Sequence, residues 1–151
     1  MGKSSAGILL WKREHDVVRV LLVHPGGPFW KNKDAGAWSI PKGEYVQGDE
    51  ALAAAKREFT EELGPLPGGE IASLGEIKQR GGKRVIGFAL EADFDCSTFK
   101  CNNFEMEWPP RSGRRQSFPE VDHAQWFSLE EARQKINPAQ AEFLDRLRAI
   151  A

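Results

Sequence analysis

The chain has few of the features that mark membrane proteins or disulfide-stabilised scaffolds. Its 151 residues include only two cysteines, Cys96 and Cys101, and neither a second cysteine pair nor histidine ligands lie near them. A zinc site is therefore not expected. No run of about 18 apolar residues is present, so we expect no membrane-spanning helix. The first five residues also lack the apolar core of a signal peptide, and a cytoplasmic location is the expectation.

The chain also lacks an excess of charge of either sign. Its 21 lysines and arginines nearly balance 22 aspartates and glutamates, for a formal net charge of −1. Such a balance does not favour a protein that coats nucleic acid or a membrane surface. The 40% hydrophobic and 28% charged residues are ordinary for a soluble globular protein, and the length fits one domain over residues 1–151.

The stretch 43–65 predicts a short amphipathic helix between two glycine-containing signals. Gly48 precedes Asp49, whose carboxylate is suited to cap the free N–H groups of a first helical turn. Gly64 followed by Pro65 predicts the end of the helix. One apolar stripe at spacings of three and four is formed by Leu52, Ala55, Phe59 and Leu63.

The other face of this predicted helix carries Glu58, Glu61 and Glu62 at positions i, i+3 and i+4. Like charges at such spacings destabilise a helix by roughly 0.2–0.5 kcal/mol per pair. Only Arg57 lies within the run to offset them, and its spacing to Glu61 is i+4. A hard cation such as Mg2+ would make the cluster favourable, because it binds carboxylate oxygens. A solvated acidic face has the same composition, so both interpretations stay open at this point.

The spacing of the surrounding residues adds a more specific signal. Gly43, Asp49 and the run 57–64 (Arg-Glu-Phe-Thr-Glu-Glu-Leu-Gly) closely resemble the Nudix box, the signature of the Nudix hydrolases. Two positions depart from it, because the family has Glu where this chain has Asp49 and a bulky aliphatic residue where it has Pro65. The resemblance implies an α+β protein with the Nudix fold, an α/β/α sandwich around a mixed sheet.

The resemblance also implies a metal-dependent hydrolase of acid anhydrides. Glu58, Glu61 and Glu62 would bind Mg2+, with Mn2+ as a possible substitute, and the metal would activate a water molecule. Arg57 is expected to orient these glutamates. In several members a glutamate in or beside a late loop completes the metal site or acts as the base, and Glu120 is the first candidate for that role.

Other candidates for the base are open. Glu105 and Glu107 rank behind Glu120 because their places relative to the loop are less telling. One of the glutamates of the predicted helix is a further alternative. His123 follows in the predicted strand 120–127, and we interpret it as a hydrogen-bonded surface histidine.

The segment before the box bears on the substrate. Residues 38–43, Trp-Ser-Ile-Pro-Lys-Gly, are similar to those of Nudix members that act on dinucleoside polyphosphates or diphosphoinositol polyphosphates. Members that act on nucleotide sugars or oxidised triphosphates more often have Pro-Gly-Gly. Lys42 is placed to neutralise a phosphate. In the loop 25–34, Trp30 is a candidate for stacking on a base and Lys31 for binding phosphates, although a solvated loop with one buried aromatic residue would look the same.

Two further basic positions are candidate phosphate ligands. Arg84 follows a predicted glycine-rich hairpin tip, and Arg111 opens the cluster completed by Arg114 and Arg115. Surface charge without a ligand is the alternative for each of them.

The rest of the chain predicts a scaffold of strands followed by helices. Apolar runs at 5–11 and 17–24 flank a short polar stretch, which predicts an antiparallel hairpin. We expect further strands at 37–40, 71–79 and 83–94 and around the alternating Phe104, Met106 and Trp108. Capping signals at Ser128 and Asn137 predict two helices, to about 136 and over 139–150.

These observations favour a Mg2+-dependent hydrolase of nucleoside polyphosphates, most simply of a dinucleoside polyphosphate. One alternative is a hydrolase of nucleoside triphosphates, nucleotide sugars or capped RNA. A second is a Nudix-fold regulator that binds nucleotides without turnover. The expected partner is a small nucleotide, without a membrane or nucleic-acid partner, and a homodimer is possible because many relatives are dimers.

Overall fold

The structure is a computed structural model that describes residues 4–46, 48–97, 99 and 101–151. Its strands are β1 (Ser4–Glu14), β2 (Val17–Pro25), β3 (Lys42–Tyr45), β4 (Ile71–Lys78), β5 (Arg84–Glu91), β6 (Asn103–Glu107), β7 (Arg115–Pro119) and β8 (Val121–Ser128). Its α-helices are α1 (Ala51–Leu63), α2 (Leu129–Lys135) and α3 (Glu142–Ile150). Within the described ranges no helix is long and apolar enough to cross a membrane.

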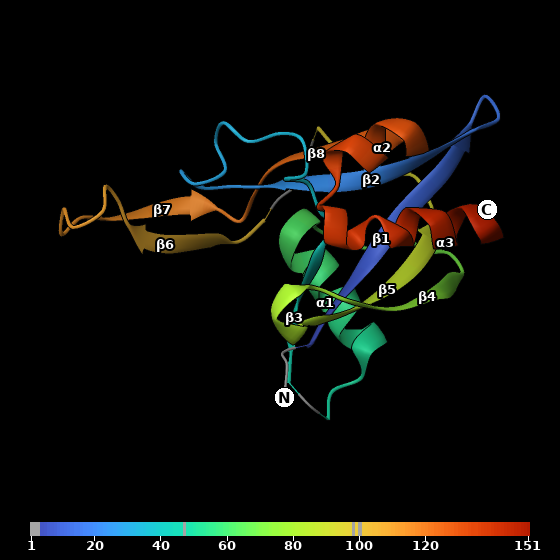
Figure 1. Ribbon diagram of the computed structural model, residues 1–151, viewed down its shortest axis with the longest axis horizontal. Coiled ribbons are helices and arrows are strands. Elements are labelled where there is room, and N and C mark those ends of the chain that lie inside the picture. The colour runs from blue at the N-terminus through green and yellow to red at the C-terminus, as the bar shows by residue number, and fades with distance from the viewer. Residues whose placement is uncertain (1–3, 47, 98, 100) are drawn as a thin grey trace.

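A six-stranded mixed sheet forms the centre of the molecule (Figure 1). Its order is β4-β5-β1-β2-β8, and β3 pairs with the first residues of β1. The β1–β2 pair is antiparallel, as predicted, with His15 and Asp16 at positive φ in a two-residue turn between Glu14 and Val17. The β1–β5 pair is parallel. The predicted α+β class, with a mixed sheet, is confirmed.

Both faces of the sheet are covered by helices. In β1, Leu9 packs into the cluster that contains residues of α2 and α3, whereas Ile8 and Leu10 pack into the cluster that contains residues of α1. All three side chains are fully buried. The alternation of a strand therefore divides one apolar run between two cores and produces the predicted α/β/α sandwich.

Helix α1 ends as the sequence predicts but begins differently. Gly64 has φ 108°, and its N–H donates to the carbonyl of Thr60 at 2.9 Å. The predicted Asp49 cap is wrong: Glu50 occupies the N-cap position, and no side chain caps the helix there. Asp49 is exposed, and its N–H donates to the carbonyl of Val46. The α1 face that packs on the sheet, with Phe59 fully buried, fixes the helix instead.

The strand predicted at 37–40 lies a few residues later in the structure. Trp38 and Ser39 form only isolated bridges, to Ile136 and Val23, and β3 begins at Lys42. The chain crosses β1 closely here, because a Cβ on Gly7 would lie 2.5 Å from the carbonyl oxygen of Pro41. Pairing with β1, rather than local residue preference, decides where this strand begins.

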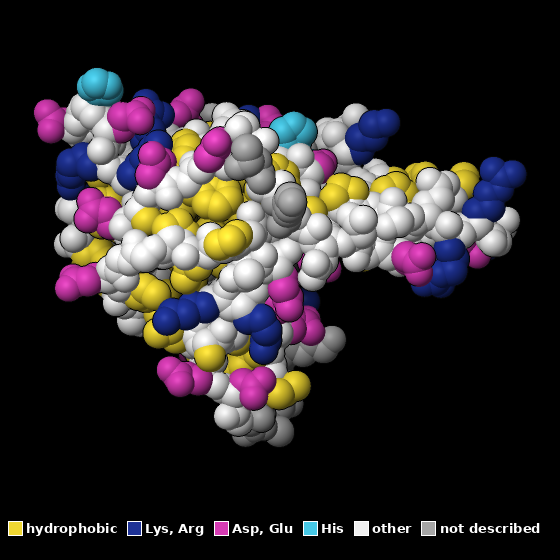
Figure 2. Space-filling model, turned by 180° about the vertical axis from the view of Figure 1, so that it is seen from behind, with side chains coloured by type: hydrophobic (Ala, Val, Ile, Leu, Met, Phe, Trp, Pro, Cys, Tyr) yellow, Lys and Arg dark blue, Asp and Glu magenta, His cyan; other side chains and the backbone are white. Residues whose placement is uncertain are grey.

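The hairpin of β4 and β5 is confirmed, with Gly81 and Gly82 at positive φ at its tip. The strand predicted from Phe104 and Met106 is β6. It pairs with β7 in a separate two-stranded hairpin, here called the arm, which projects from the body of the molecule (Figure 1). Lys and Arg side chains gather at the tip of the arm (Figure 2).

The capping box at Ser128 is confirmed. The Ser128 hydroxyl accepts from the N–H of Glu131, and the Glu131 carboxylate accepts from the N–H of Ser128. The predicted last helix is divided into a 3-10 turn over Pro138–Gln140 and α3.

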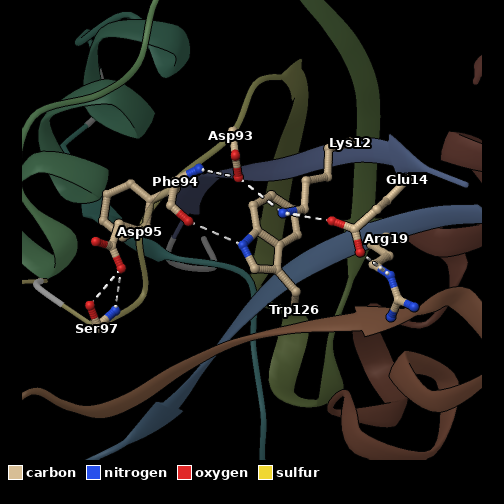
Figure 3. A network of polar contacts seen from close by, with 8 residues as sticks. All are labelled: Lys12, Glu14, Arg19, Asp93, Phe94, Asp95, Ser97 and Trp126. Atoms are coloured by element: carbon tan, nitrogen blue, oxygen red, sulfur yellow. Dashed lines mark hydrogen bonds and ion pairs between the residues drawn. The ribbon is translucent and has the colours of Figure 1, made fainter.

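A polar network ties the segment after β5 to the sheet (Figure 3). The Trp126 indole N–H donates to the carbonyl of Phe94 at 3.1 Å, and the Lys12 ammonium lies 4.4 Å from the centroid of the Trp126 ring. Lys12 also donates to Asp93 at 3.0 Å, and this hydrogen bond is the main cause that lowers the pKa of Asp93. The network anchors the chain that leads from β5 toward the arm.

Candidate active site

Helix α1 presents its glutamates beside a buried apolar stripe. Phe59 and Leu63 are buried against the sheet, and Glu58, Glu61 and Glu62 occupy the neighbouring positions. The Glu58 side chain is only 16% exposed. Packing of the stripe therefore holds the carboxylates partly out of water, where mutual repulsion is stronger than on a surface.

Glu58 lies directly beneath β3. A Cβ on Gly43 would lie 2.2 Å from Oε2 of Glu58, so a larger residue here would displace the Glu58 carboxylate. Burial raises the pKa of Glu58, the charge of Glu61 raises it further, and Arg57 opposes both. The Arg57 guanidinium lies 3.7 Å from Glu58 Oε1. The expected Arg57–Glu61 contact is thus replaced by a contact with Glu58, the adjacent residue.

Glu62 is the most strongly perturbed carboxyl group in the cluster. Burial, then the charges of Glu58 and Glu120, raise its pKa to about 8. Its Oε2 atom is buried and has no hydrogen-bond partner in the described part of the chain. The Lys42 ammonium and backbone N–H oppose the shift. Burial lowers the pKa of Lys42, whereas the negative charge of Glu62 raises it. Lys42 therefore lies in the site next to a carboxylate.

Glu120 joins the cluster from the other side, between β7 and β8. Burial and the charge of Glu61 raise its pKa. Its N–H donates to the carbonyl of Asn102, and the Asn102 N–H donates to the carbonyl of Glu61, each at 3.0 Å. The Glu120 carbonyl accepts from the N–H of Gly26 at 3.0 Å. These backbone bonds fix Glu120 between the last turn of α1 and the end of β2.

The carboxylates fit a hard divalent cation by their chemistry. They supply only oxygen ligands, their mutual repulsion raises the pKa of Glu58 and Glu62, and one buried oxygen of Glu62 lacks a partner. Over the described residues no three His, Cys, Asp or Glu side chains are already grouped as a metal cluster.

The candidate substrate residues are spread more widely. Trp30 is 41% exposed, with the Lys33 ammonium 5.3 Å from its ring centroid, and Lys31 is exposed in the same loop. Arg84 lies 3.8 Å from Glu76 on β4. Arg111 lies at the tip of the arm, where the arm projects farthest from the body (Figure 1).

Lys83, which directly precedes Arg84, also lies next to the site. The Lys83 ammonium lies 4.0 Å from Glu44 on β3, and its charge lowers the pKa of Lys42. Of the two basic residues after the glycine tip, Lys83 is therefore the one that faces the site. Only its position directly after the glycines could have indicated this.

The comparisons with known proteins agree with this architecture. The family model of the NUDIX domain matches residues 1–147. An Ap4A hydrolase from C. elegans, in a binary complex, is 17% identical with a TM-score of 0.64, over 98% of this chain and 96% of that chain. The NUDIX domain of Shewanella oneidensis NrtR, complexed with ADP ribose, is 14% identical with a TM-score of 0.66, over 99% and 88%. RenU, a Nudix hydrolase from M. smegmatis, is 21% identical with a TM-score of 0.62, over 97% and 84%.

No curated protein sequence matches the chain. At such low identities the solved structures establish the fold, and the family model, which spans nearly all of the chain, establishes the family. The resemblance to the Nudix box is thereby confirmed. The chain belongs to the Nudix hydrolase family, and it is an enzyme of the pyrophosphohydrolase class.

Proposed function

We propose that this protein hydrolyses a phosphoanhydride bond in a nucleoside diphosphate linked to another moiety, most simply a dinucleoside polyphosphate. The observation that carries the proposal is the convergence of Glu58, Glu61 and Glu62 with Glu120, next to the partly buried Lys42. Four carboxyl groups with one adjacent cation would repel a polyphosphate unless a metal ion lay between them. The same arrangement becomes productive once a metal is bound.

Each residue has a separate role in this proposal. Glu58, Glu61 and Glu62 would hold Mg2+, and Mn2+ is the expected substitute. Bound metal would neutralise the phosphates and lower the pKa of a coordinated water molecule. Arg57 holds the carboxylate of Glu58, at 3.7 Å, in its orientation.

Glu120 is the proposed general base, which takes the proton from the attacking water. A general base works best when its pKa lies near the working pH, because it is then deprotonated and still accepts a proton readily. The raised pKa of Glu120 moves this carboxyl group in that direction. Water then attacks phosphorus, the anhydride P–O bond breaks, and the leaving phosphate departs as an oxyanion. Fixed backbone bonds on both sides of Glu120 support this role, since a base must be held within reach of its proton.

The substrate class rests on Lys42 and on the loop after β2. Lys42 would meet a phosphate beside Glu62, while Trp30 would stack on a base and Lys31 would bind phosphates at the rim. Arg84 and Arg111 stay as more distant candidates for phosphate contact. One structural neighbour is an Ap4A hydrolase and another was complexed with ADP ribose, which supports a nucleotide carrying linked phosphates as the ligand class.

Two alternatives remain testable. The same site would suit a hydrolase of nucleoside triphosphates, nucleotide sugars or capped RNA. A nucleotide-binding regulator without turnover is less well supported, because a module that only binds has no need of four mutually repelling carboxyl groups.

A substrate panel distinguishes these possibilities. The full chain would be incubated with Mg2+ and dinucleoside polyphosphates, nucleoside triphosphates, nucleotide sugars and capped RNA, and the products would be separated by chromatography. We expect mononucleotide release from a dinucleoside polyphosphate, abolished in Glu62→Gln and kept in Glu70→Gln, which removes an exposed carboxylate elsewhere. Nucleotide binding without turnover on any substrate would support the regulator instead.

A further inference from the structure

His24 is a buried histidine with a hydrogen-bond partner at each ring nitrogen. It lies near the end of β2 and is only 6% exposed. Its Nδ1 is 2.7 Å from Oδ1 of Asp122 on β8, and its Nε2 is 2.6 Å from the carbonyl oxygen of Lys33. One imidazole therefore joins β2 to β8, which lies 98 residues later in the sequence, and to the loop 26–34 directly after β2, here called the rim loop.

The two partners determine how many protons the ring must carry. A carbonyl oxygen and a carboxylate both accept hydrogen bonds, so each ring nitrogen has to donate. A neutral imidazole carries one N–H and can satisfy only one of the two acceptors. Both short hydrogen bonds form together when His24 is an imidazolium. A neutral ring would leave one of the two acceptors without its donor from His24.

Carboxylates and aromatic rings surround His24. Asp122 faces the ring from β8. The pKa of Asp34, next to Lys33, is lowered chiefly by hydrogen bonds from Lys135 and Trp38 and to a smaller extent by His24. The Trp38 ring packs against the imidazole edge at 5.2 Å. His123 is exposed, and its Nδ1 lies 3.1 Å from the same Asp122 oxygen.

These contacts reach the candidate active site at two points. Asp122 lies two residues after Glu120, and the Gly26 N–H, two residues after His24, donates to the carbonyl of Glu120. The strand register between β2 and β8 shifts between His24 and Pro25, so regular ladder pairing does not fix this junction. On the other side, Lys33 belongs to the rim loop that carries Trp30 and Lys31.

We propose that His24 is a positioning residue. As an imidazolium it ties the rim loop to the start of β8, and so sets Glu120 and the rim loop at a fixed distance from the glutamates of α1. The kinetic part of this proposal rests on the proposed hydrolase function, whereas its structural part does not.

The structural part is tested on the full-length wild-type protein by nitrogen-15 NMR of the histidine side chains at neutral pH. We expect His24 to show N–H protons on both ring nitrogens, protected from exchange with solvent. Hydrogen exchange of the backbone over residues 26–34 should become faster in His24→Gln and in the more conservative Asp122→Asn. His123→Gln is the matched control, because it removes a histidine contact to the same Asp122 oxygen but no contact to the rim loop. A single ring N–H in the wild type, or unchanged exchange of the rim loop in both variants, would overturn the proposal.

The kinetic part uses whichever substrate the wild type hydrolyses. Loss of one charge-assisted hydrogen bond predicts that His24→Gln lowers kcat/KM roughly tenfold to a hundredfold, with both kcat and KM affected. His123→Gln should stay within about twofold. An equal effect of the two variants on kcat and KM would contradict a positioning role. If the wild type hydrolyses nothing, the proposed function fails, while the NMR and exchange measurements still decide the role of His24.

Discussion

Gly43 and Glu58 are so close that a Cβ on residue 43 would lie 2.1 Å from the carboxyl carbon of Glu58. The glycine therefore allows β3 to cross over α1 at the point where the first glutamate of the cluster projects. We predict that Gly43→Ala displaces Glu58 and weakens Mg2+ binding at least tenfold, measured by isothermal titration calorimetry. Gly68→Ala is the control, because a Cβ on Gly68 would have no atom within 4 Å. Unchanged Mg2+ affinity in Gly43→Ala would show that the contact has no functional consequence.

The raised pKa of Glu62 predicts a pH-dependent stability in the metal-free protein. Folding raises this pKa from 4.5 to about 8, so the folded state binds the proton more tightly than the unfolded state. The stabilisation is complete below about pH 4.5 and is lost as the pH rises through about 8. The free energy of unfolding should therefore fall by up to about 1.4 kcal/mol per pH unit over this window.

Urea unfolding in the presence of a chelator checks this prediction for the wild type and for Glu62→Gln. Glu58 and Glu120 also have raised pKa values and contribute to the slope in the same direction. The difference between the two proteins isolates Glu62. Identical slopes would mean that Glu62 does not carry a proton at neutral pH.

Helix α1 and the β1–β2 and β4–β5 hairpins were predictable because their signals are local. The glutamate spacing, Gly64 and the alternating apolar runs each act within a few residues. The start of β3 was not predictable, because it depends on pairing with β1. Strand β7 was not predictable because Arg115–Pro119 has no apolar alternation of its own. Asp49 was assigned as a cap from its type alone, whereas packing of Phe59 and Leu63 decides how α1 is held.

In the candidate site, too, residues with a local sequence pattern were predictable and long-range contacts were not. The α1 glutamates, Lys42 and Glu120 were identified from the sequence, and the structure brings them together. The link between His24 and Asp122 spans 98 residues and has no local pattern, so only the folded structure could reveal it. Lys83 follows the glycine tip in the sequence, but the β1–β5 pairing is what brings it to the site.

Removal of the Lys42 charge should change substrate preference. Lys42→Met keeps most of the aliphatic side chain and deletes the ammonium group beside Glu62. We expect kcat/KM for a dinucleoside tetraphosphate to fall about tenfold more than for a nucleoside diphosphate derivative, because the longer chain places more charge near Lys42. Lys83→Met, which removes the neighbouring exposed charge, should have a smaller effect. Equal losses on both substrates in Lys42→Met would exclude a role in chain-length preference.

Asp49 departs from the family signature, and its substitution should have little effect. It is exposed and does not cap α1, so Asp49→Asn should change the free energy of unfolding by no more than about 0.5 kcal/mol. Mg2+ affinity should also stay unchanged, in contrast to Glu61→Gln. A large loss of Mg2+ affinity in Asp49→Asn would assign this residue to the metal site.

The central claim is that Glu120 and the α1 glutamates together direct water onto a phosphoanhydride. Its most direct test is hydrolysis of a dinucleoside polyphosphate in water enriched in a heavy oxygen isotope, with the products weighed by mass spectrometry. We predict Mg2+-dependent incorporation of one heavy oxygen into one product, slowed at least a hundredfold in Glu120→Gln although that variant still binds Mg2+. Incorporation at the wild-type rate in Glu120→Gln, or no hydrolysis by a wild-type protein that binds both Mg2+ and nucleotide, would contradict the account.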